Sequence, residues 1–363
     1  MEDKMSFEEL QGMVSICIDE IINLKQENEI VKKKNLELEK MVNNMLENQK
    51  TLINSVSQCF DNIETNRHFI NHALDNIKYE LQDDMEGEDK YILQFYDFNI
   101  TIDGIVKEGK SLARFGDGEF AVMAGKSRQK FQRYDERLAE RLREIVVSNE
   151  EGLMIAVADN YGSLEKYSED GRQGIRNYMT KEIRLEQRKW LDLSRTYHNA
   201  YITRPYVLFA DNETDGPLKR FMRLRQIWDK KNVIIIEGSL TRLGVGNDLF
   251  SNAARIRRIE APAVSSFDRY DDILRAAMKY VEEGIIFLIA LGPAAGVLVY
   301  DLYKAGYQAI DIGHMDLEYE WYLSGTGCRS VVKNKYNNEL LGGDQVEDIV
   351  DEKFYAQVIE KIC

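Results

Sequence analysis

The sequence predicts an α/β domain with a mostly parallel sheet and helices on both faces, preceded by a long parallel coiled coil. Two observations support this fold class. A seven-residue apolar repeat runs through the N-terminal part, and from Tyr91 onward short apolar runs alternate with helical patterns. The first pattern is typical of supercoiled helices and the second of a parallel sheet. We therefore expect a coiled-coil segment at 1–82, a linker at 83–92 and an α/β domain at 93–363.

The composition narrows the class of protein. The chain has 363 residues, of which 44% are hydrophobic, so it can bury a sizeable core. Its net charge of −14 argues against a dedicated nucleic-acid binder, which needs a basic surface. The four cysteines show no CxxC pairing, so neither a zinc site nor a disulfide framework is indicated. No signal peptide and no apolar run of about 20 residues is found, so we expect a cytoplasmic protein without a transmembrane segment.

The heptad positions of the N-terminal segment favour a parallel homodimer. From about Leu10 to Ile77, β-branched residues are frequent at a positions, whereas Leu and other unbranched residues are frequent at d positions. Asn28 and Asn35 occupy a positions, where they disfavour other registers and higher oligomers. Three attractive g-to-e pairs agree with this register: Glu20–Lys25, Glu27–Lys32 and Lys34–Glu39. A helix folded back on the body, or a helical hairpin, is the alternative.

Five strand-like runs and six helical patterns alternate in the C-terminal body. The expected strands are Ser111–Phe115, Leu153–Ala158, Val233–Ile236, Ile285–Leu291 and Ala309–Ile312. The expected helices are Glu136–Val146, Arg172–Leu191, Pro217–Asp229, Asn247–Arg255, Tyr270–Glu283 and Ala294–Lys304. In a parallel sheet of this kind, ligands bind beyond the carboxyl ends of the strands. The polar motifs that follow these strands are therefore candidates for one shared site.

The segment Arg114–Phe120 carries the strongest functional signal. Asp117 and Glu119 lie one residue apart, next to Gly116 and Gly118. In extended backbone, residues i and i+2 point to the same side, so we expect both carboxylates to face one point. Two hard oxygen donors with open positions left over suit Mg²⁺ or Mn²⁺ bound to a phosphate. An Asp-Gly turn with a solvated Glu is the ordinary alternative.

A glycine-rich loop follows the third expected strand. Gly244 and Gly246 precede Asn247 and Asp248, either of which could cap the next helix. A glycine loop that leads into a helix N-terminus offers free N–H groups to an anion, and Arg242 adds a charge that fits phosphate. The loop is therefore a candidate phosphate cradle, although an ordinary strand-to-helix loop would show the same pattern.

Other strand ends carry further candidates. Gly292 precedes an expected helix, whose first turn could hold a phosphate. The segment Asp311–Tyr322 crowds one histidine and four acidic residues at the end of the last strand, and could supply a metal ligand or a general base. His314 and Asp316 lie nearest that strand end, although a solvated helix start is the alternative. Arg204 could bind a phosphate or a sugar carboxylate, or form a structural salt bridge.

Taken together, five segments resemble one family, the bacterial glycosyltransferases of the GT-D fold, first described as domain of unknown function 1792 (DUF1792). They are RFGDGE (114–119), KFQRYDERLAERL (130–142), RLGVGNDLF (242–250), LGPAAGVLVYDL (291–302) and AIDIGHMDLEYEW (309–321). The resemblance covers about Leu93 to Leu341 in the right order. It implies a Rossmann-like sheet of the GT-D type. It also implies transfer of a sugar from a nucleotide sugar, such as UDP-glucose, to a glycan on a surface protein or polysaccharide.

The resemblance also implies roles for particular residues. The Asp-x-Glu motif of the family matches Asp117 and Glu119, which would hold Mn²⁺, or Mg²⁺, directly or through water. Asp316, or else Asp248, would accept the proton of the acceptor hydroxyl if the enzyme inverts. The nucleotide sugar would be bound by residues of these motifs: Arg114, Arg242, Gly244, Gly246, Asn247, Gly292 and His314. Arg204, which lies outside the five segments, is a further candidate for this binding.

Two other functions stay open at this point. A metal-dependent phosphohydrolase also needs paired carboxylates at a strand end but uses water as the acceptor, and the sequence shows no separate nucleophilic Asp motif for it. A non-enzymatic scaffold would use the coiled coil as its functional part and the α/β body as a nucleotide- or glycan-binding module. The coiled coil lies outside the family domain, so it bears on partners rather than on the chemistry.

Overall fold

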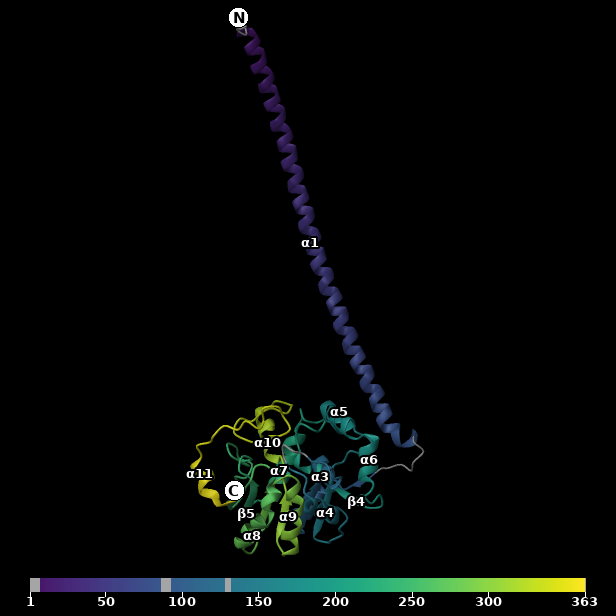
Figure 1. The fold of residues 1–363 in the computed structure, drawn as a ribbon, viewed down its shortest axis with the longest axis vertical. Coiled ribbons are helices and arrows are strands. Elements are labelled where there is room, and N and C mark those ends of the chain that lie inside the picture. The colour runs from purple at the N-terminus through teal and green to yellow at the C-terminus, as the bar shows by residue number, and fades with distance from the viewer. Residues whose placement is uncertain (1–6, 86–92, 128–131, 363) are drawn as a thin grey trace. The chain divides into compact units, whose positions relative to one another are not determined.

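Figure 1 shows the computed structural model, which describes residues 7–85, 93–127 and 132–362. The chain divides after Ile77 into an N-terminal helical unit and an α/β unit. Residues 86–92 of the predicted linker lie outside the described residues, as do the first two residues of the KFQRYDERLAERL segment.

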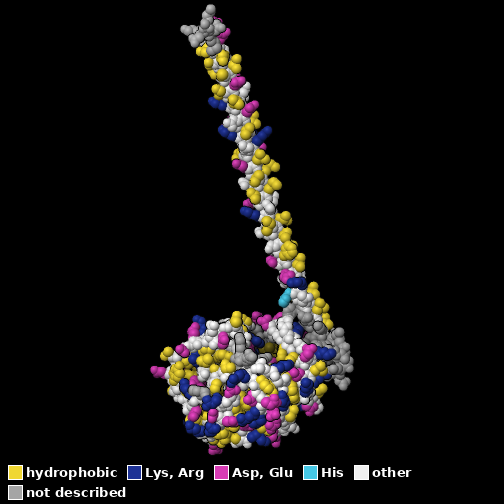
Figure 2. Space-filling view, viewed as in Figure 1, with side chains coloured by type: hydrophobic (Ala, Val, Ile, Leu, Met, Phe, Trp, Pro, Cys, Tyr) yellow, Lys and Arg dark blue, Asp and Glu magenta, His cyan; other side chains and the backbone are white. Residues whose placement is uncertain are grey.

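The first unit contains most of the long helix α1 (Phe7–Met85), which confirms the helix predicted there. The apolar side chains at the predicted a and d positions are exposed in the single chain; Ile21, Leu24 and Leu38 are 51%, 63% and 57% exposed. Figure 2 shows hydrophobic side chains along the length of this helix. Whether α1 pairs with a second copy is not tested by one chain, so the parallel dimer stays a prediction. Among the described residues, no helix has the length and apolar character that crossing a membrane requires.

The second unit contains one sheet, in which the described residues form nine strands and every pair is parallel. The strands are β1 (Gln94–Phe95), β2 (Ser111–Phe115), β3 (Leu153–Val157), β4 (Thr196–Asn199), β5 (Asn232–Gly238), β6 (Arg255–Ala261), β7 (Ile286–Ala290), β8 (Gln308–Asp311) and β9 (Val358–Lys361). Their order across the sheet is β1-β4-β3-β2-β8-β7-β5-β6-β9. From β2 the chain builds β3 and β4 on one side, and β8 later returns beside β2 from the other side. Ligand crevices open where the strand order reverses in this way.

Helices cover both faces of the sheet, as predicted. One face packs against α4 (Glu136–Val146), α8 (Tyr270–Lys279) and α9 (Pro293–Lys304), and the other against α2 (Phe98–Val106), α7 (Gly216–Arg225) and α10 (Met315–Ser324). The remaining helices are α3 (Asp117–Met123), α5 (Glu169–Tyr178), α6 (Lys181–Gln187) and α11 (Glu352–Gln357).

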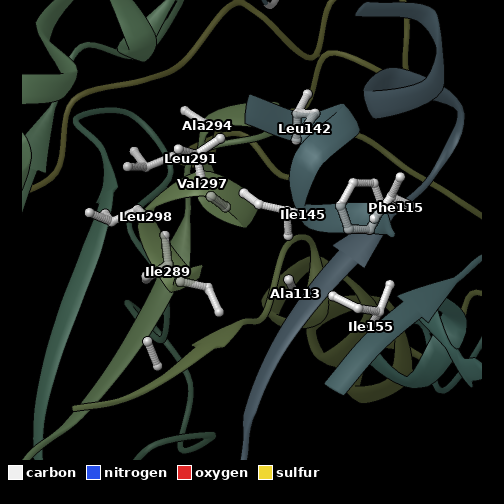
Figure 3. Close-up of a cluster of buried hydrophobic side chains, with 14 of the residues drawn as sticks. Ala113, Phe115, Leu142, Ile145, Ile155, Ile289, Leu291, Ala294, Val297 and Leu298 are labelled. Atoms are coloured by element: carbon white, nitrogen blue, oxygen red, sulfur yellow. The ribbon is translucent and has the colours of Figure 1, made fainter. Parts of the chain in front are cut away.

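Alternate residues of each central strand contribute to different hydrophobic clusters. In β2, Leu112 belongs to the cluster on the α2 and α7 side, whereas Ala113 and Phe115 belong to the one on the α4 and α9 side. Figure 3 shows the second cluster, in which Phe115 lies with Ile145 of α4 and Val297 of α9. Burial on both faces explains why these strands read as continuous apolar runs in the sequence.

The predicted elements differ from the structure mainly at the sheet edges. The five predicted strands all exist, but β1, β4, β6 and β9 were missed. These four strands form the two edges of the sheet and are only partly buried, so their sequences lack an apolar run. The predicted helix Asn247–Arg255 is wrong, because turns lead from the glycine loop directly into β6. The predicted helix Arg172–Leu191 is two helices, since Thr180 caps a new helix, α6.

Candidate active site

A cavity of about 380 Å³ opens at the carboxyl ends of the strands, next to the reversal between β2 and β8. Glycines after three strands contribute to its walls: Gly116 after β2, Gly292 after β7 and Gly313 after β8. The predicted site residues that line it are Arg114, Asp117, Glu119, Arg204, Gly292, His314 and Asp316. The structure thus brings together, in one cavity, residues that are far apart in the sequence.

The two carboxylates of the Asp-x-Glu motif lie in the first turn of a helix. Gly116 is the N-cap of α3, and the Glu119 Oε2 accepts a hydrogen bond from the Gly116 N–H at 2.7 Å. The prediction of an extended segment is therefore wrong here. Because each helical residue turns by about 100°, Asp117 and Glu119 do not project in the same direction as they would in a strand. Both side chains still border the cavity.

Glu119 has unusual electrostatics for a carboxylate at a strand end. Burial raises its pKa to about 7, the Gly116 N–H opposes this shift, and the nearby Asp311 adds to it. A bound cation would favour the ionised form of such a group. Glu119 is thus a carboxyl whose charge state responds to what the cavity contains.

Arg114 connects β2 to the end of β8. Its Nε donates to the Asp311 carbonyl at 3.0 Å and its Nη2 to the Asp311 Oδ1 at 2.7 Å. The Gly313 N–H donates to the same Oδ1 at 3.0 Å. Gly313 has a φ of +43°, and a Cβ at this position would lie 2.0 Å from the Arg114 Nη2, so only glycine fits. Arg114 therefore braces the loop that presents His314.

A second group of charges surrounds Glu339. Arg204 forms a two-pronged ion pair with the Glu339 carboxylate, the His314 Nδ1 lies 3.2 Å from its Oε1, and the Arg329 Nη1 lies 3.4 Å from its Oε2. Burial would raise the pKa of Glu339, but the charges of Arg204 and His314 hold it well below its usual range. All four side chains line the cavity, so it contains a basic cluster formed by Arg204, Arg329 and His314.

Tyr201 also lines the cavity. Its hydroxyl donates to the Asn160 Oδ1 at 2.6 Å. Burial raises the pKa of Tyr201, the charge of Arg204 opposes the shift, and the charge of Asp117 adds to it. Asp117 and Arg204, whose charges act on this phenol, line the same cavity.

Most of the predicted phosphate cradle faces away from the cavity. The Arg242 Nη1 donates to the carbonyls of Asn334 and Glu347, at 3.0 and 2.6 Å, and the residue is 7% exposed. The Gly244 N–H donates to the Asp316 Oδ1 at 2.9 Å. Of this loop, the described lining of the cavity contains Gly238, Thr241 and Leu243, but not Arg242, Gly244, Gly246 or Asn247. The loop thus fastens the C-terminal segment instead of presenting its predicted residues to a ligand.

The two carboxylates predicted as bases are both engaged by protein groups. The Asp316 Oδ1 also accepts from the Asn247 Nδ2 at 2.8 Å, and its Oδ2 accepts from the Lys335 Nζ at 2.6 Å. Asp248 accepts from Tyr319 and Arg225, which lower its pKa, and it is absent from the described lining of the cavity. These contacts favour a structural role for both residues.

The donor set of the cavity fits a divalent cation that is shared with a phosphate. Within the described residues, no group of three or more His, Cys, Asp and Glu side chains could hold a metal ion by itself. A hard cation such as Mg²⁺ needs only one or two protein carboxylates when waters and phosphate oxygens supply the other ligands. Asp117 and Glu119 supply this number of carboxylates to the cavity lining.

The residues that sequence reasoning missed are Tyr201, Arg329, Lys335 and Glu339. Tyr201 follows β4, which was not recognised as a strand. The other three lie in the irregular segment after α10, where neither a strand nor a helix pattern suggests a place in the fold. If β4 had been predicted as a strand, Tyr201 would have been a candidate, because it lies just beyond the carboxyl end of that strand.

Fold and cavity together define an α/β protein with a cavity lined by acidic and basic side chains at the carboxyl ends of a parallel sheet. A family model described as "Glycosyltransferase GT-D fold" matches residues 112–340, which include most of this sheet and the cavity. The chain therefore belongs to the GT-D family of glycosyltransferases. This confirms both the resemblance and the enzyme class that the sequence predicts; α1 lies outside the matched region.

Curated relatives agree with this assignment. The "Probable glycosyl transferase Gly" of Streptococcus gordonii is 34% identical over 266 residues, which is 72% of this chain and 38% of that protein. The "Glycosyltransferase GlyD" of Streptococcus pneumoniae is 33% identical over 276 residues, which is 75% of this chain and 33% of that protein. The match thus spans well under half the length of these relatives.

Solved structures share the fold. A structure described as "The highly conserved domain of unknown function 1792 has a distinct glycosyltransferase fold" has a TM-score of 0.69 and 32% identity, covering 75% of this chain and 96% of its own. "A New Glycosyltransferase (DUF1792) from Streptococcus sanguinis" has a TM-score of 0.68 and 33% identity, covering 75% and 100%. The predicted fold class is thereby confirmed.

Proposed function

We propose that this chain transfers a sugar from a nucleoside diphosphate sugar, a UDP-sugar such as UDP-glucose, to a glycan or glycoprotein acceptor in the synthesis of surface glycans. The observation that carries the proposal is that one cavity at the strand reversal contains both the Asp-x-Glu carboxylates and a cluster of basic side chains. Carboxylates can hold a cation and guanidinium groups can bind phosphate oxygens, which are the two needs of a nucleoside diphosphate. The names of the relatives support the transfer chemistry.

In this proposal each group of the cavity has one task. Mn²⁺, or Mg²⁺, when bound would neutralise charge on the departing nucleoside diphosphate, and Asp117 and Glu119 would hold it. Arg204 and His314 would bind phosphate oxygens, since they already bind a carboxylate at this place. Arg114 would keep His314 in position through its contacts with the end of β8.

Substitution of the carboxylates tests the metal dependence. We expect Asp117→Ala and Glu119→Ala each to abolish the Mn²⁺-dependent part of UDP binding and to reduce sugar transfer by about 100-fold or more, because the cation would lose one of two protein ligands. Calorimetry with UDP, with and without Mn²⁺, measures the first effect, and a screen of nucleotide sugars for donor hydrolysis measures the second.

Asp271→Ala is the matched control, because this side chain lies on α8, is 63% exposed and is not part of the described cavity lining. Tight UDP binding that ignores both the metal and the two substitutions would contradict the metal-dependent mechanism. Rapid hydrolysis of simple phosphate esters with no sugar transferred would instead favour the phosphohydrolase, and binding without turnover would favour the scaffold.

The N-terminal helix and the location complete the proposal. We propose that α1 joins two chains in a parallel coiled coil, because its apolar a and d side chains are exposed along its length in the single chain. The cytoplasmic location expected from the sequence stays a prediction.

A further inference from the structure

Glu339 sits where an anionic ligand of this cavity would be expected. Three basic side chains from different parts of the chain converge on it: Arg204 follows the short helical turn after β4, His314 follows β8, and Arg329 follows α10. The Glu339 side chain is 23% exposed and lies at the cavity wall. A carboxylate that is held by two guanidinium groups and an imidazole occupies the kind of place that a phosphate prefers.

The basic cluster carries more positive charge than Glu339 can neutralise. The other acidic group that acts on Arg204 is Glu318, whose Oε2 accepts from the N–H groups of Tyr206 and Val207. Burial raises the pKa of Glu318, whereas the charge of Arg204 and these two N–H groups oppose the shift. A diphosphate, which carries at least two charges, would match the two arginines better than one carboxylate does.

Glu339 belongs to an irregular segment that is held to the rest of the α/β unit just before it, at Lys335 and Tyr336. The buried Lys335 donates to Asp316 and to Glu320, each at 2.6 Å, and the Tyr336 N–H donates to the Leu240 carbonyl at 2.8 Å. After Tyr336 the chain has no regular secondary structure until α11. The ion pairs of Glu339 therefore join this segment to Arg204 and His314 in the cavity wall.

We propose that Arg204, Arg329 and His314 form the subsite for the diphosphate of the donor, and that Glu339 occupies this subsite until the diphosphate displaces it. The proposal rests on the proposed function in so far as the donor is a nucleoside diphosphate sugar. It adds two residues that neither the family motifs nor the sequence pattern indicates, Arg329 as a ligand of the diphosphate and Glu339 as its internal competitor. A ligand can bind only those chains in which Glu339 has left the subsite. The apparent affinity is therefore the intrinsic affinity multiplied by the fraction of chains in which the subsite is open.

Calorimetry on the full-length chain tests this competition. The ligands are UDP and inorganic pyrophosphate, each in the presence of Mn²⁺, and the variants are Glu339→Gln and Arg329→Gln. We expect Glu339→Gln to bind both ligands about 5-fold more tightly or better, because the competing charge is removed while the side-chain shape is kept. We expect Arg329→Gln to bind both about 10-fold more weakly, because one charged contact to the phosphates is lost. Both side chains are at least partly exposed, so neither change should prevent folding.

Glu347→Gln is the matched control, since it makes the same change in the same segment but its partner is the exposed Lys333, at 3.6 Å. Its affinity should stay within about twofold of the wild type. Unchanged or weaker binding of UDP and pyrophosphate by Glu339→Gln would contradict the proposed competition, even if sugar transfer is observed. The proposal would also be contradicted if neither ligand bound to the wild type or to Glu339→Gln. Tighter pyrophosphate binding by Glu339→Gln without turnover of any nucleotide sugar would support the subsite and contradict the proposed function.

Discussion

The surroundings of the Glu119 carboxyl act on its charge in opposite directions. It accepts the N–H of Gly116 at the start of α3, and it borders the cavity beside Asp311. Its pKa in the fold is about 7, above the ordinary value of 4.5, because burial disfavours the charge. The folded state therefore holds this proton at pH values where the unfolded chain has released it. Below pH 4.5 both states are protonated and no stability is lost, whereas stability falls as the pH rises from there towards 7.

We expect Glu119→Gln to remove this pH-dependent loss in metal-free buffer. The amide keeps an oxygen for the Gly116 N–H but carries no charge, so the variant should be more stable than the wild type by about 1–3 kcal/mol at pH 8 and equal to it near pH 4.5. Thermal unfolding with a chelator at both pH values measures the difference. Glu144→Gln, at a side chain that is 57% exposed, is the control and should show no such trend. An equal effect of Glu119→Gln at both pH values would show that burial does not control the Glu119 charge.

Site residues were predictable from the sequence to the extent that a motif directly follows a central strand. Asp117, Glu119, Gly292 and His314 were found in this way and all line the cavity. The directions of their side chains were not predictable, because Gly116 begins a helix where an extended segment was expected. Glu339 was not predictable because its place depends on ion pairs across the cavity and not on a local pattern.

At the scale of elements, the C-terminal segment and the glycine loop depend on each other. The prediction of the glycine loop as a phosphate cradle rested on its composition, yet Gly244 and Asn247 both donate to Asp316. Asp316 in turn accepts from Lys335, which is buried. The composition made the loop a candidate for binding an anion, but it could not show that its N–H groups donate to a side chain of the same protein.

We expect Lys335→Met to loosen this connection. The substitution leaves Asp316 buried without its cationic partner, which should destabilise the α/β domain by about 3 kcal/mol or more. Thermal unfolding measures this as a lower Tm. Lys333→Met is the control, because this side chain is 79% exposed and its loss should change the Tm little. Equal Tm values for the two variants would mean that the buried Lys335–Asp316 pair does not support the fold.

Strands at the centre of the sheet were easier to predict from the sequence than strands near its edges. The central strands β2, β3, β5, β7 and β8 are buried on both faces, and their apolar runs made them predictable. Strand β6, next to the edge strand β9, instead mixes charged and apolar residues, and its buried Arg258 pairs with Glu237 of β5. A buried ion pair between two strands cannot be recognised from the sequence of either strand alone.

At the scale of the whole molecule, the heptad repeat of α1 leads to the last prediction. A helix of 79 residues with exposed apolar side chains along its length has little to stabilise it as a single chain in water. Pairing with a second copy would bury its a and d positions, and each buried Leu would contribute about 1.5–3 kcal/mol. A dimer would also carry two cavities, which could strengthen binding to a repetitive acceptor.

We expect the full-length chain to have twice the mass of a 42.1 kDa monomer by light scattering at micromolar concentration. The double variant Leu24→Glu and Leu38→Glu should be monomeric, because it places like charges opposite each other in the apolar seam. Gln26→Glu and Lys40→Glu change residues at outer f positions of the same heptads, so this control should remain a dimer. The monomeric variant should still bind UDP with wild-type affinity, since the described cavity is lined by residues 114–339 alone. A monomeric wild type, or a dimer that survives the Leu substitutions, would contradict pairing through this seam.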